Sequence, residues 1–294
     1  MAHPGEAATP LTAAVLRKYA LPRLDKGADK EMRGPVLVIG SSRTVPGAAL
    51  LTGVAALRAG AGKLLIAAPR SLAMELGLAA PESGIIPLVE TNSGDPRAGS
   101  ALRHGLANAA AAVVGPGLLA LGGGGALARA VLNLPCSGPL ILDAGALQAV
   151  RPNAKLPRRG PAVILTPNYR EMAELTRMPL TRLEADPLKV ARAVARTTGA
   201  FVILKSEITH VVTPAGAAWV HVRGMPGLAT SGSGDVLAGV IAGLAARCGD
   251  ALTACLWGVA AHARAGARLS RRIGAIGFLA RELLEEIPGA LRKA

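Results

Sequence analysis

A glycine-rich turn that leads into an apolar helical pattern has the clearest chemical potential in this sequence. Residues 227–244 read Gly-Leu-Ala-Thr-Ser-Gly-Ser-Gly-Asp-Val-Leu-Ala-Gly-Val-Ile-Ala-Gly-Leu. Gly232 and Gly234 allow a sharp turn and a close approach of the backbone to a ligand. The N–H groups of the first helical turn point outwards along the helix dipole, so this stretch predicts a binding site for an anion.

Asp235 stands inside this predicted anion site. A carboxylate repels a phosphate, so the acid needs a separate explanation. It is either a residue that caps the helix N-terminus or a general base that takes the proton of a hydroxyl group attacking a phosphoryl group. The local sequence supports both interpretations equally.

Five further segments place turn residues or polar side chains at the carboxyl ends of expected strands. Ligands of parallel α/β sheets bind at these ends, so we expect the segments to line one cleft. Lys205 is able to neutralise a phosphate there, although a solvated lysine is the more common case. For Asp143, a structural or indirect role is favoured over direct ligand contact. The segments are Gly40-Ser41, Gly115-Pro116-Gly117, Asp143, Thr166-Pro167-Asn168 and Lys205.

Several common catalytic motifs are absent from the sequence. It has no Gly-x-x-x-x-Gly-Lys-Ser/Thr phosphate loop, no Gly-x-Gly-x-x-Gly after the first strand and no Gly-x-Ser-x-Gly elbow. The histidines are too isolated to form a metal-ligand set, so no metal ligand is assigned and each is expected to be structural or solvated. They are His3, His104, His210, His221 and His262.

The elements that must position these residues alternate between strands and helices. Strands are expected at 35–40, 63–69, 84–89, 109–114, 139–143, 161–167 and 200–205, with a hairpin at 210–214 and 217–222. Helices are expected at 11–24 with a linker, 48–60, 71–80, 126–134, from 171, and at 236–246, 251–269 and 278–287. This order predicts a three-layer α/β/α domain with a mostly parallel central sheet. We expect an N-terminal extension and linker at 1–33 and a single domain at 34–294.

The composition agrees with an α/β domain and limits the possible partners. The 294 residues are 51% apolar but only 2% aromatic, so Ala, Leu, Val and Ile must build the core. The formal net charge is +14. Two each of Phe, Trp and Tyr are few for base stacking, and no nucleic-acid motif is present, so no nucleic-acid partner is expected. A surface that attracts anionic small molecules, or an Arg-rich composition without a specific partner, explains the charge.

The cysteines and the N-terminal sequence indicate a cytoplasmic protein. Cys136, Cys248 and Cys255 have no Cys-x-x-Cys spacing, and their odd number argues against a disulfide framework. No signal peptide is recognised. The charge-free run at 105–128 is broken by glycines and Pro116, so no membrane span is expected.

Taken jointly, the motifs resemble a known family. Thr230 to Leu244 looks like the anion-hole and catalytic-aspartate segment of the ribokinase-like superfamily. The other motifs agree in order and spacing with the ADP- or ATP-dependent NAD(P)H-hydrate dehydratases, in the form of a standalone dehydratase domain without the epimerase domain. This resemblance covers roughly residues 34–288. Its motifs are Gly47-Ala-Ala, Leu57-Arg-Ala-Gly-Ala-Gly-Lys63, Val114-Gly-Pro-Gly-Leu118, Leu142-Asp-Ala-Gly-Ala-Leu147, Leu165-Thr-Pro167 with Glu171, and Leu204-Lys205 with Thr209.

The resemblance implies a repair reaction in which the hydrated dinucleotides NADHX or NADPHX lose water at the expense of ADP or ATP, with Mg²⁺ screening the phosphates. It implies that Asp235 takes the proton of the C6 hydroxyl and that phosphate then leaves as the ring nitrogen supplies electrons. A separate NAD(P)H-hydrate epimerase is the implied functional partner, and we expect a homo-oligomer. The anion hole is implied for Ser231, Gly232, Ser233 and Gly234, nucleotide binding for Lys205, Ser206, Glu207, Ile208, Thr209 and Gly234, and substrate binding for Gly40, Gly117, Asn168 and Asp235.

Some residues depart from the family pattern. Asn168 stands where the family has histidine, and an asparagine keeps one donor and one acceptor but does not titrate. These departures concern substrate contacts and turnover, so two alternatives stay open. One is a small-molecule kinase resembling hydroxyethylthiazole kinase, and the other is a degenerate nucleotide-binding protein. The further departures are Ser41, Arg170 and Ser206 in place of glycine, Met225 in place of asparagine and Ala267 in place of an acid.

Overall fold

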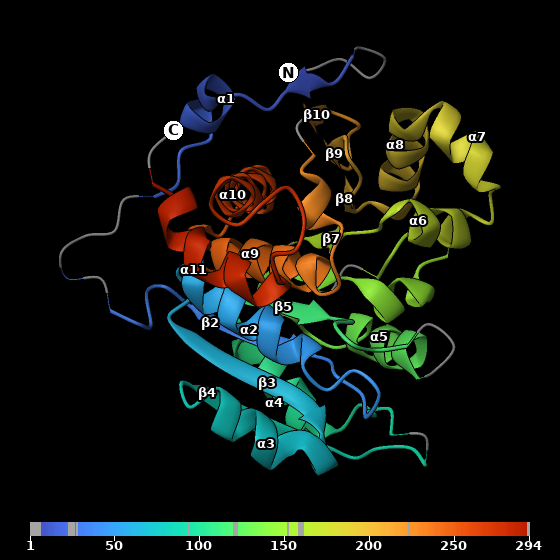
Figure 1. Cartoon of the computed structure of the whole chain (residues 1–294). Coiled ribbons are helices and arrows are strands. Elements are labelled where there is room, and N and C mark those ends of the chain that lie inside the picture. Colours follow the sequence, from blue (N-terminus) through green and yellow to red (C-terminus); the bar gives the residue numbers. More distant parts are fainter. Residues whose placement is uncertain are drawn as a thin grey trace.

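One mixed sheet runs through the protein (Figure 1). The computed structural model describes residues 7–22, 27, 29–92, 94–119, 123–151, 153–157, 162–222 and 224–292. In these ranges the strands are β1 (Thr9–Pro10), β2 (Pro35–Ile39), β3 (Lys63–Pro69), β4 (Ser83–Leu88), β5 (Ala111–Val114), β6 (Leu140–Leu142), β7 (Val163–Leu165), β8 (Phe201–Leu204), β9 (Thr209–Val212) and β10 (Ala218–His221). Their spatial order is β1-β10-β9-β8-β7-β6-β5-β2-β3-β4. The pairs from β4 to β8 are parallel, whereas β9 is antiparallel to both its neighbours.

Helices cover both faces of this sheet (Figure 1). Side chains from α1, α2, α3, α9, α10 and α11 belong to one core cluster, and those from α4, α5, α6, α7 and α8 belong to the other. The helix bounds are α1 (Ala13–Lys18), α2 (Ala48–Arg58), α3 (Ala73–Ala79), α4 (Ser100–Asn108), α5 (Gly124–Leu132), α6 (Tyr169–Thr176), α7 (Leu180–Ala185), α8 (Pro187–Thr198), α9 (Ser233–Cys248), α10 (Ala251–Arg272) and α11 (Ala280–Ala290). Short 3₁₀ helices are η1 (Arg70–Leu72), η2 (Ala144–Ala149) and η3 (Pro226–Leu228).

Strand β2 shows why the sheet lies in the middle layer. Val36 and Val38 point into one core cluster, and Leu37 and Ile39 point into the other. Successive side chains of a strand point to opposite faces, so an uninterrupted apolar strand requires cover on both sides. The predicted three-layer α/β/α fold with a mostly parallel central sheet is therefore confirmed.

Small residues allow the helices of the first layer to approach closely. A Cβ atom at Gly239 of α9 would overlap the carbonyl oxygen of Thr52 in α2, and one at Gly243 would overlap that of Ala56. Helix α9 therefore rests directly on the backbone of α2. This contact fixes the N-terminal turn of α9, which holds the predicted anion site.

The structure adds helices that the sequence analysis did not predict, namely α4, α7 and α8. A signal for α8 was present in the sequence, because the Asp186 carboxylate accepts from the Lys189 backbone N–H and Pro187 occupies the first turn. The strand expected at 161–167 is shorter, since β7 covers Val163–Leu165, and Pro161 lies outside the described residues.

The described part of the N-terminal extension is built into the fold. β1 pairs in parallel with β10, and Leu16 of α1 is buried. Residues 1–6, 23–26 and 28 of this segment lie outside the described residues. The division into an extension at 1–33 and a domain at 34–294 stays a prediction.

Across the described ranges, every helix is too short or too polar to span a bilayer.

Candidate active site

A cavity of about 640 Å³ opens where the carboxyl ends of β7 and β8 meet the N-terminus of α9. Its walls include residues from the β9–β10 hairpin, the segment 224–230 and α10. Among the predicted site residues, the structure places seven in this wall: Asn168, Lys205, Ser206, Glu207, Thr209, Ser233 and Gly234. Its lining does not include Ile208, Ser231, Gly232 or Asp235. Most of the implied nucleotide segment and half of the implied anion hole therefore face the same space.

The N-terminus of α9 begins at a left-handed glycine. Gly232 is the N-cap residue, with φ of +86°, a conformation that glycine adopts without strain. Asp235 follows three residues later, in the first helical turn. It is therefore not the N-cap residue, and the capping interpretation of this acid is wrong.

The carboxyl group of Asp235 sits in surroundings that disfavour its charge. Burial, together with the nearby carboxylates of Asp143 and Glu171, raises its pKa to about 7, against the opposing effect of Lys205. A carboxylate with a pKa near neutrality is suited to accept and release a proton at physiological pH. This arrangement fits the general-base interpretation.

Lys205 is held beside the helix N-terminus by a buried network. Its Nζ atom lies 2.7 Å from Asp143 Oδ1, which also accepts from Thr166 Oγ1 at 2.6 Å. Although burial opposes its charge, Asp143 and Glu171 raise the pKa of Lys205 and keep the ammonium protonated. The same Nζ atom would lie 3.2 Å from a Cβ atom placed at Gly234. Lys205 is thus a fixed positive charge next to the predicted anion site, and Asp143 holds it there.

Asn168 has a local role that explains its residue type. Its Oδ1 atom accepts from the Glu171 backbone N–H at 2.9 Å, and Glu171 Oε2 accepts from the Asn168 backbone N–H at 2.7 Å. This capping box starts α6, and the Asn-x-x-Glu spacing was its signal in the sequence. The side-chain N–H₂ group of Asn168 takes no part in this capping box.

Ser206 and its neighbours shape the turn that follows β8. The Ser206 hydroxyl donates to the Ile208 carbonyl at 2.7 Å, and Thr209 Oγ1 donates to the Ser206 carbonyl at 3.0 Å. The serine that stands in place of the family's glycine therefore adds a side-chain hydrogen bond that stabilises this turn. Ile208 is exposed, whereas Gly224 packs against the backbone of Glu207.

Gly40 and Gly117 form a separate pair of turns at the ends of the neighbouring strands β2 and β5. The Ser41 N–H donates to the Pro116 carbonyl at 2.7 Å, and Ser42 Oγ donates to the Gly117 carbonyl at 2.8 Å. Neither glycine lines the 640 Å³ cavity. Beyond Gly117, Leu118 lines a second cavity of about 260 Å³. Glu171 belongs to that second wall as well. The expected strand ends therefore do not line a single cavity, and Gly40 and Gly117 line neither of these two.

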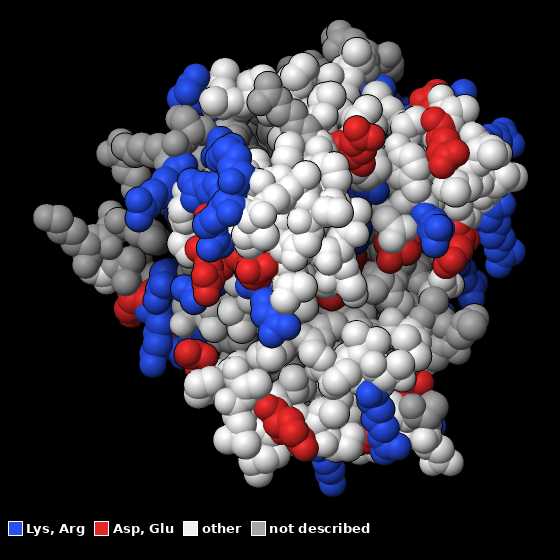
Figure 2. All heavy atoms as spheres, viewed as in Figure 1, with Lys and Arg blue, Asp and Glu red and all other residues white. Residues whose placement is uncertain are grey.

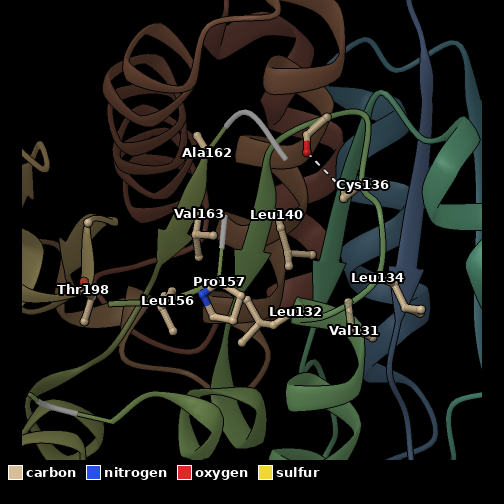
Figure 3. Close-up of a pocket in the computed structure, with 12 residues that line it drawn as sticks. Val131, Leu132, Leu134, Cys136, Leu140, Leu156, Pro157, Ala162, Val163 and Thr198 are labelled. Carbon is tan, nitrogen blue, oxygen red and sulfur yellow. Dashed lines mark hydrogen bonds between the residues drawn. The ribbon is translucent and has the colours of Figure 1, made fainter. Parts of the chain in front are cut away.

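A third cavity lies towards the amino ends of β6 and β7 (Figure 3). Leu132, Leu140 and Cys136 are among its apolar walls, and Cys136 Sγ donates to the Gly138 carbonyl at 3.2 Å. Its volume of about 20 Å³ has room for one water molecule only. Burial raises the pKa of the Cys136 thiol, which disfavours the reactive thiolate form.

Comparisons with known proteins agree with the site. A family model described as NAD(P)H-hydrate dehydratase matches residues 36–289. The chain is 48% identical to the ADP-dependent (S)-NAD(P)H-hydrate dehydratase of Xanthomonas campestris, over 96% of this chain and 95% of the relative. It is 35% identical to a bifunctional NAD(P)H-hydrate repair enzyme of Moorella thermoacetica, of which it spans only 53%.

A solved structure shows the same fold along nearly the whole chain. The crystal structure of the ADP/ATP-dependent NAD(P)H-hydrate dehydratase from Bacillus subtilis, co-crystallised with ATP and Mg²⁺, superposes with a TM-score of 0.82 at 28% identity. The match covers 96% of this chain and 97% of the other. The chain therefore belongs to the NAD(P)H-hydrate dehydratase family.

Proposed function

We propose that this protein returns NADHX and NADPHX to NADH and NADPH by a dehydration that consumes ADP or ATP. The observation that carries the proposal is the pairing of Asp235, with its pKa near 7, and the open N-terminus of α9 beside Lys205. Phosphoryl transfer to a hydroxyl needs a base for the hydroxyl proton and donors for the phosphate oxygens. This chain supplies both within one helical turn.

In the proposed reaction, Asp235 takes the proton of the C6 hydroxyl as that oxygen attacks the terminal phosphorus atom. The backbone N–H groups of Ser231, Gly232 and Gly234 hold the phosphoryl oxygens, whereas the Ser233 N–H already donates to the Thr230 carbonyl at 3.2 Å. Lys205 offsets the phosphate charge. The C6–O bond then breaks, phosphate leaves with its bonding electrons, and the ring nitrogen supplies a pair to C6. Loss of one proton from C5 restores the double bond. In the overall reaction, one phosphate–phosphate bond of the nucleotide is broken, and phosphate and one proton are released.

Mg²⁺ supplies charge neutralisation to the nucleotide phosphates in such a transfer. Among the described residues, no group of three or more His, Cys, Asp or Glu side chains is placed to hold a metal ion. Carboxylates are nevertheless the ligands that Mg²⁺ prefers, and those of Asp143 and Glu171 stand next to Lys205. Asp143 Oδ1 is already bonded to Lys205 Nζ and Thr166 Oγ1, so Glu171 and the second Asp143 oxygen would be the protein atoms to hold Mg²⁺, which would neutralise phosphate charge.

The substrate side of the proposal involves Gly40, Gly117 and Asn168. Gly117 has φ of +71°, and a Cβ atom there would lie 2.7 Å from the Val45 carbonyl oxygen, so a side chain is excluded from this turn. Gly117 is half-buried and Gly40 is buried, so glycine is required at both turns by the packing of neighbouring protein atoms. Asn168 lines the nucleotide cavity after β7, and β6 separates that strand from β5, which leads to the Gly117 turn.

The names of the relatives suggest a functional partner. The chain spans about half of several bifunctional NAD(P)H-hydrate repair enzymes, and we propose that its activity is linked to an NAD(P)H-hydrate epimerase. A cytoplasmic location and a homo-oligomeric state are part of the same proposal. Measuring the mass of the purified protein in solution tests the oligomeric state.

The experiment combines the protein with hydrated NADH, Mg²⁺ and either ADP or ATP. Return of the reduced-nicotinamide absorbance together with phosphate release supports the dehydratase. A stable phosphorylated product would instead indicate a kinase, and nucleotide binding without turnover would indicate a degenerate binding protein. Running ADP and ATP in parallel identifies the preferred nucleotide.

A further inference from the structure

A buried histidine reaches the N-terminus of α9 from the neighbouring helix α10. His262 Nε2 lies 3.0 Å from Ser233 Oγ and 3.0 Å from the Ser233 carbonyl oxygen. Both residues are buried, with exposed fractions of 9% for His262 and 4% for Ser233. They also line the 640 Å³ cavity. The sequence analysis expected this histidine to be structural or solvated.

The two contacts determine which ring nitrogen carries the proton. A carbonyl oxygen only accepts hydrogen bonds, so the Nε2 atom facing the Ser233 carbonyl must carry a hydrogen. An N–H group does not accept, so the Ser233 hydroxyl is unable to donate its proton to that nitrogen. The hydroxyl oxygen therefore accepts a share of the same N–H, and its own hydrogen is directed elsewhere.

The charges around the ring keep it neutral. His262 lies near Lys205 at the end of β8 and near His221 at the end of β10. Burial, together with these groups, lowers the pKa of His262 to about 4, although the hydrogen bond to Ser233 opposes the change. At neutral pH the ring has a single proton, and the contacts place it on Nε2.

We propose that His262 is a positioning residue, whose Nε2–H group fixes Ser233 so that the Ser233 hydroxyl donates to the phosphate held at the N-terminus of α9. Ser233 is the first residue of the helix and immediately precedes Gly234, the glycine nearest to Lys205. A hydroxyl proton from Ser233 would add a side-chain donor to the backbone N–H groups already aimed at the anion. This inference rests on the proposed function and assigns a new part of its machinery.

The test compares the rates at which four variants convert NADHX to NADH. His262→Leu removes the N–H donor, and His262→Gln retains one on a side chain of similar reach. Ser233→Ala removes the hydroxyl, and the double variant combines Ser233→Ala with His262→Leu. His210→Leu is the matched control, because His210 is also buried but does not line the cavity. Thermal unfolding checks that each variant is folded.

We expect His262→Leu to lower kcat about tenfold to a hundredfold, as loss of an orienting group does in other sites, with the KM for NADHX changed by less than about twofold. His262→Gln should recover most of the rate. In the Ser233→Ala background, His262→Leu should lower kcat by less than about threefold, because substitutions of residues that act as a unit do not have additive effects. His210→Leu should leave kcat unchanged.

Equal losses from His262→Leu in both backgrounds would overturn the proposal, because His262 would then not act through the Ser233 hydroxyl. A second measurement does not depend on activity. The ¹⁵N chemical shifts of the His262 ring in the wild-type protein should show hydrogen on Nε2 and none on Nδ1, and the opposite tautomer would also overturn the proposal. If wild-type protein does not repair NADHX, the proposed function fails, while the ring measurement still tests the contact.

Discussion

Asp235 is the residue whose chemistry depends most on its surroundings. Replacing it with asparagine keeps the size of the side chain but removes the base. We expect Asp235→Asn to bind nucleotide normally and to lose about 10²- to 10⁴-fold in rate. Nucleotide affinity by calorimetry and steady-state turnover check the two parts separately. Turnover close to that of the wild type would rule out the assignment of Asp235 as the base.

The raised pKa of Asp235 also predicts a pH dependence. Its carboxylate is the reactive form, so kcat/KM should rise with pH up to about 7 and level off above it. The stability effect has the opposite sign. In the folded state Asp235 holds its proton up to about pH 7, whereas the unfolded chain releases it near the ordinary value of 3.8, so its contribution to stability falls as pH rises through this window.

A comparison of melting temperatures checks this second effect. Asp235→Asn should melt at a higher temperature than the wild type at pH 8, and the difference should shrink towards pH 4. A variant that is less stable at pH 8 would show that the carboxylate is stabilised where it stands. The ionised form of Asp235 would then favour both catalysis and folding stability.

The two polar groups of the Asn168 side chain have different proposed roles, and substitutions can test them separately. Its Oδ1 atom caps α6, and asparagine is among the best N-cap residues. We expect Asn168→Ala to lose about 1 kcal/mol of folding stability along with substrate affinity. Asn168→Asp retains the cap oxygen and removes the N–H₂ donor, so it should be as stable as the wild type but have a higher KM for NADHX. Equal KM values for Asn168→Asp and the wild type would exclude the substrate contact.

At the scale of elements, the contact between α2 and α9 decides where the anion site lies. A methyl group at Gly239 would overlap the Thr52 carbonyl oxygen, and the overlap involves backbone that is unable to move aside cheaply. We expect Gly239→Ala to lower the free energy of unfolding by about 1–3 kcal/mol and to reduce kcat, because α9 must shift. Urea denaturation and turnover measure the two effects.

Gly99 provides the control for that substitution. It precedes α4, has an ordinary negative φ, and has no atoms within 4 Å of an added Cβ atom. Gly99→Ala should therefore change the free energy of unfolding by less than about 1 kcal/mol. If both variants lose the same stability, the close approach of α9 to α2 is not what matters.

At the scale of the whole molecule, the N-terminal segment closes one side of the core. Trp257 Nε1 donates to the Tyr19 carbonyl at 2.7 Å, and the Tyr19 ring meets Trp219 edge-on at 5.8 Å. These are the two tryptophans of the chain. Deleting residues 1–20 should therefore lower the melting temperature and shift the tryptophan emission to longer wavelength, because both rings become wetter.

The control for this deletion is Tyr19→Phe, which retains the backbone carbonyl and the ring edge. It should show the emission of the wild type. A truncated protein with unchanged emission and melting temperature would mean that the N-terminal segment does not contribute to the core. The extension would then be a true linker.

Part of the excess of basic over acidic residues in this protein has a structural explanation. Figure 2 shows Lys and Arg side chains gathered over the C-terminal helices. In that part of the chain, Arg264 and Arg268 donate to the carbonyls of Ala290 and Gly289 at the end of α11, and Arg268 and Arg272 pair with Glu286. Several arginines thus hold the last helix in place.

The amino-acid sequence by itself determined the fold class and the position of the glycine-rich turn that starts α9. Both depend on local properties: the apolar strands alternate with helical patterns, and glycine adopts the positive φ of position 232 without strain. Family motifs then indicated the reaction. The missed helix α8 buries Val190, Ala191, Val194 and Ala195, which recur at helical spacing, so the sequence did contain its signal.

Only the tertiary structure decided the state of the groups in the site. The pKa of Asp235 depends on burial and on Asp143 and Glu171, which come from other strand ends. The contact between His262 and Ser233 joins residues 29 positions apart on two helices. The protonation state of a side chain depends on its burial and on the positions of neighbouring polar atoms. The spacing of residues in the sequence determines neither of these.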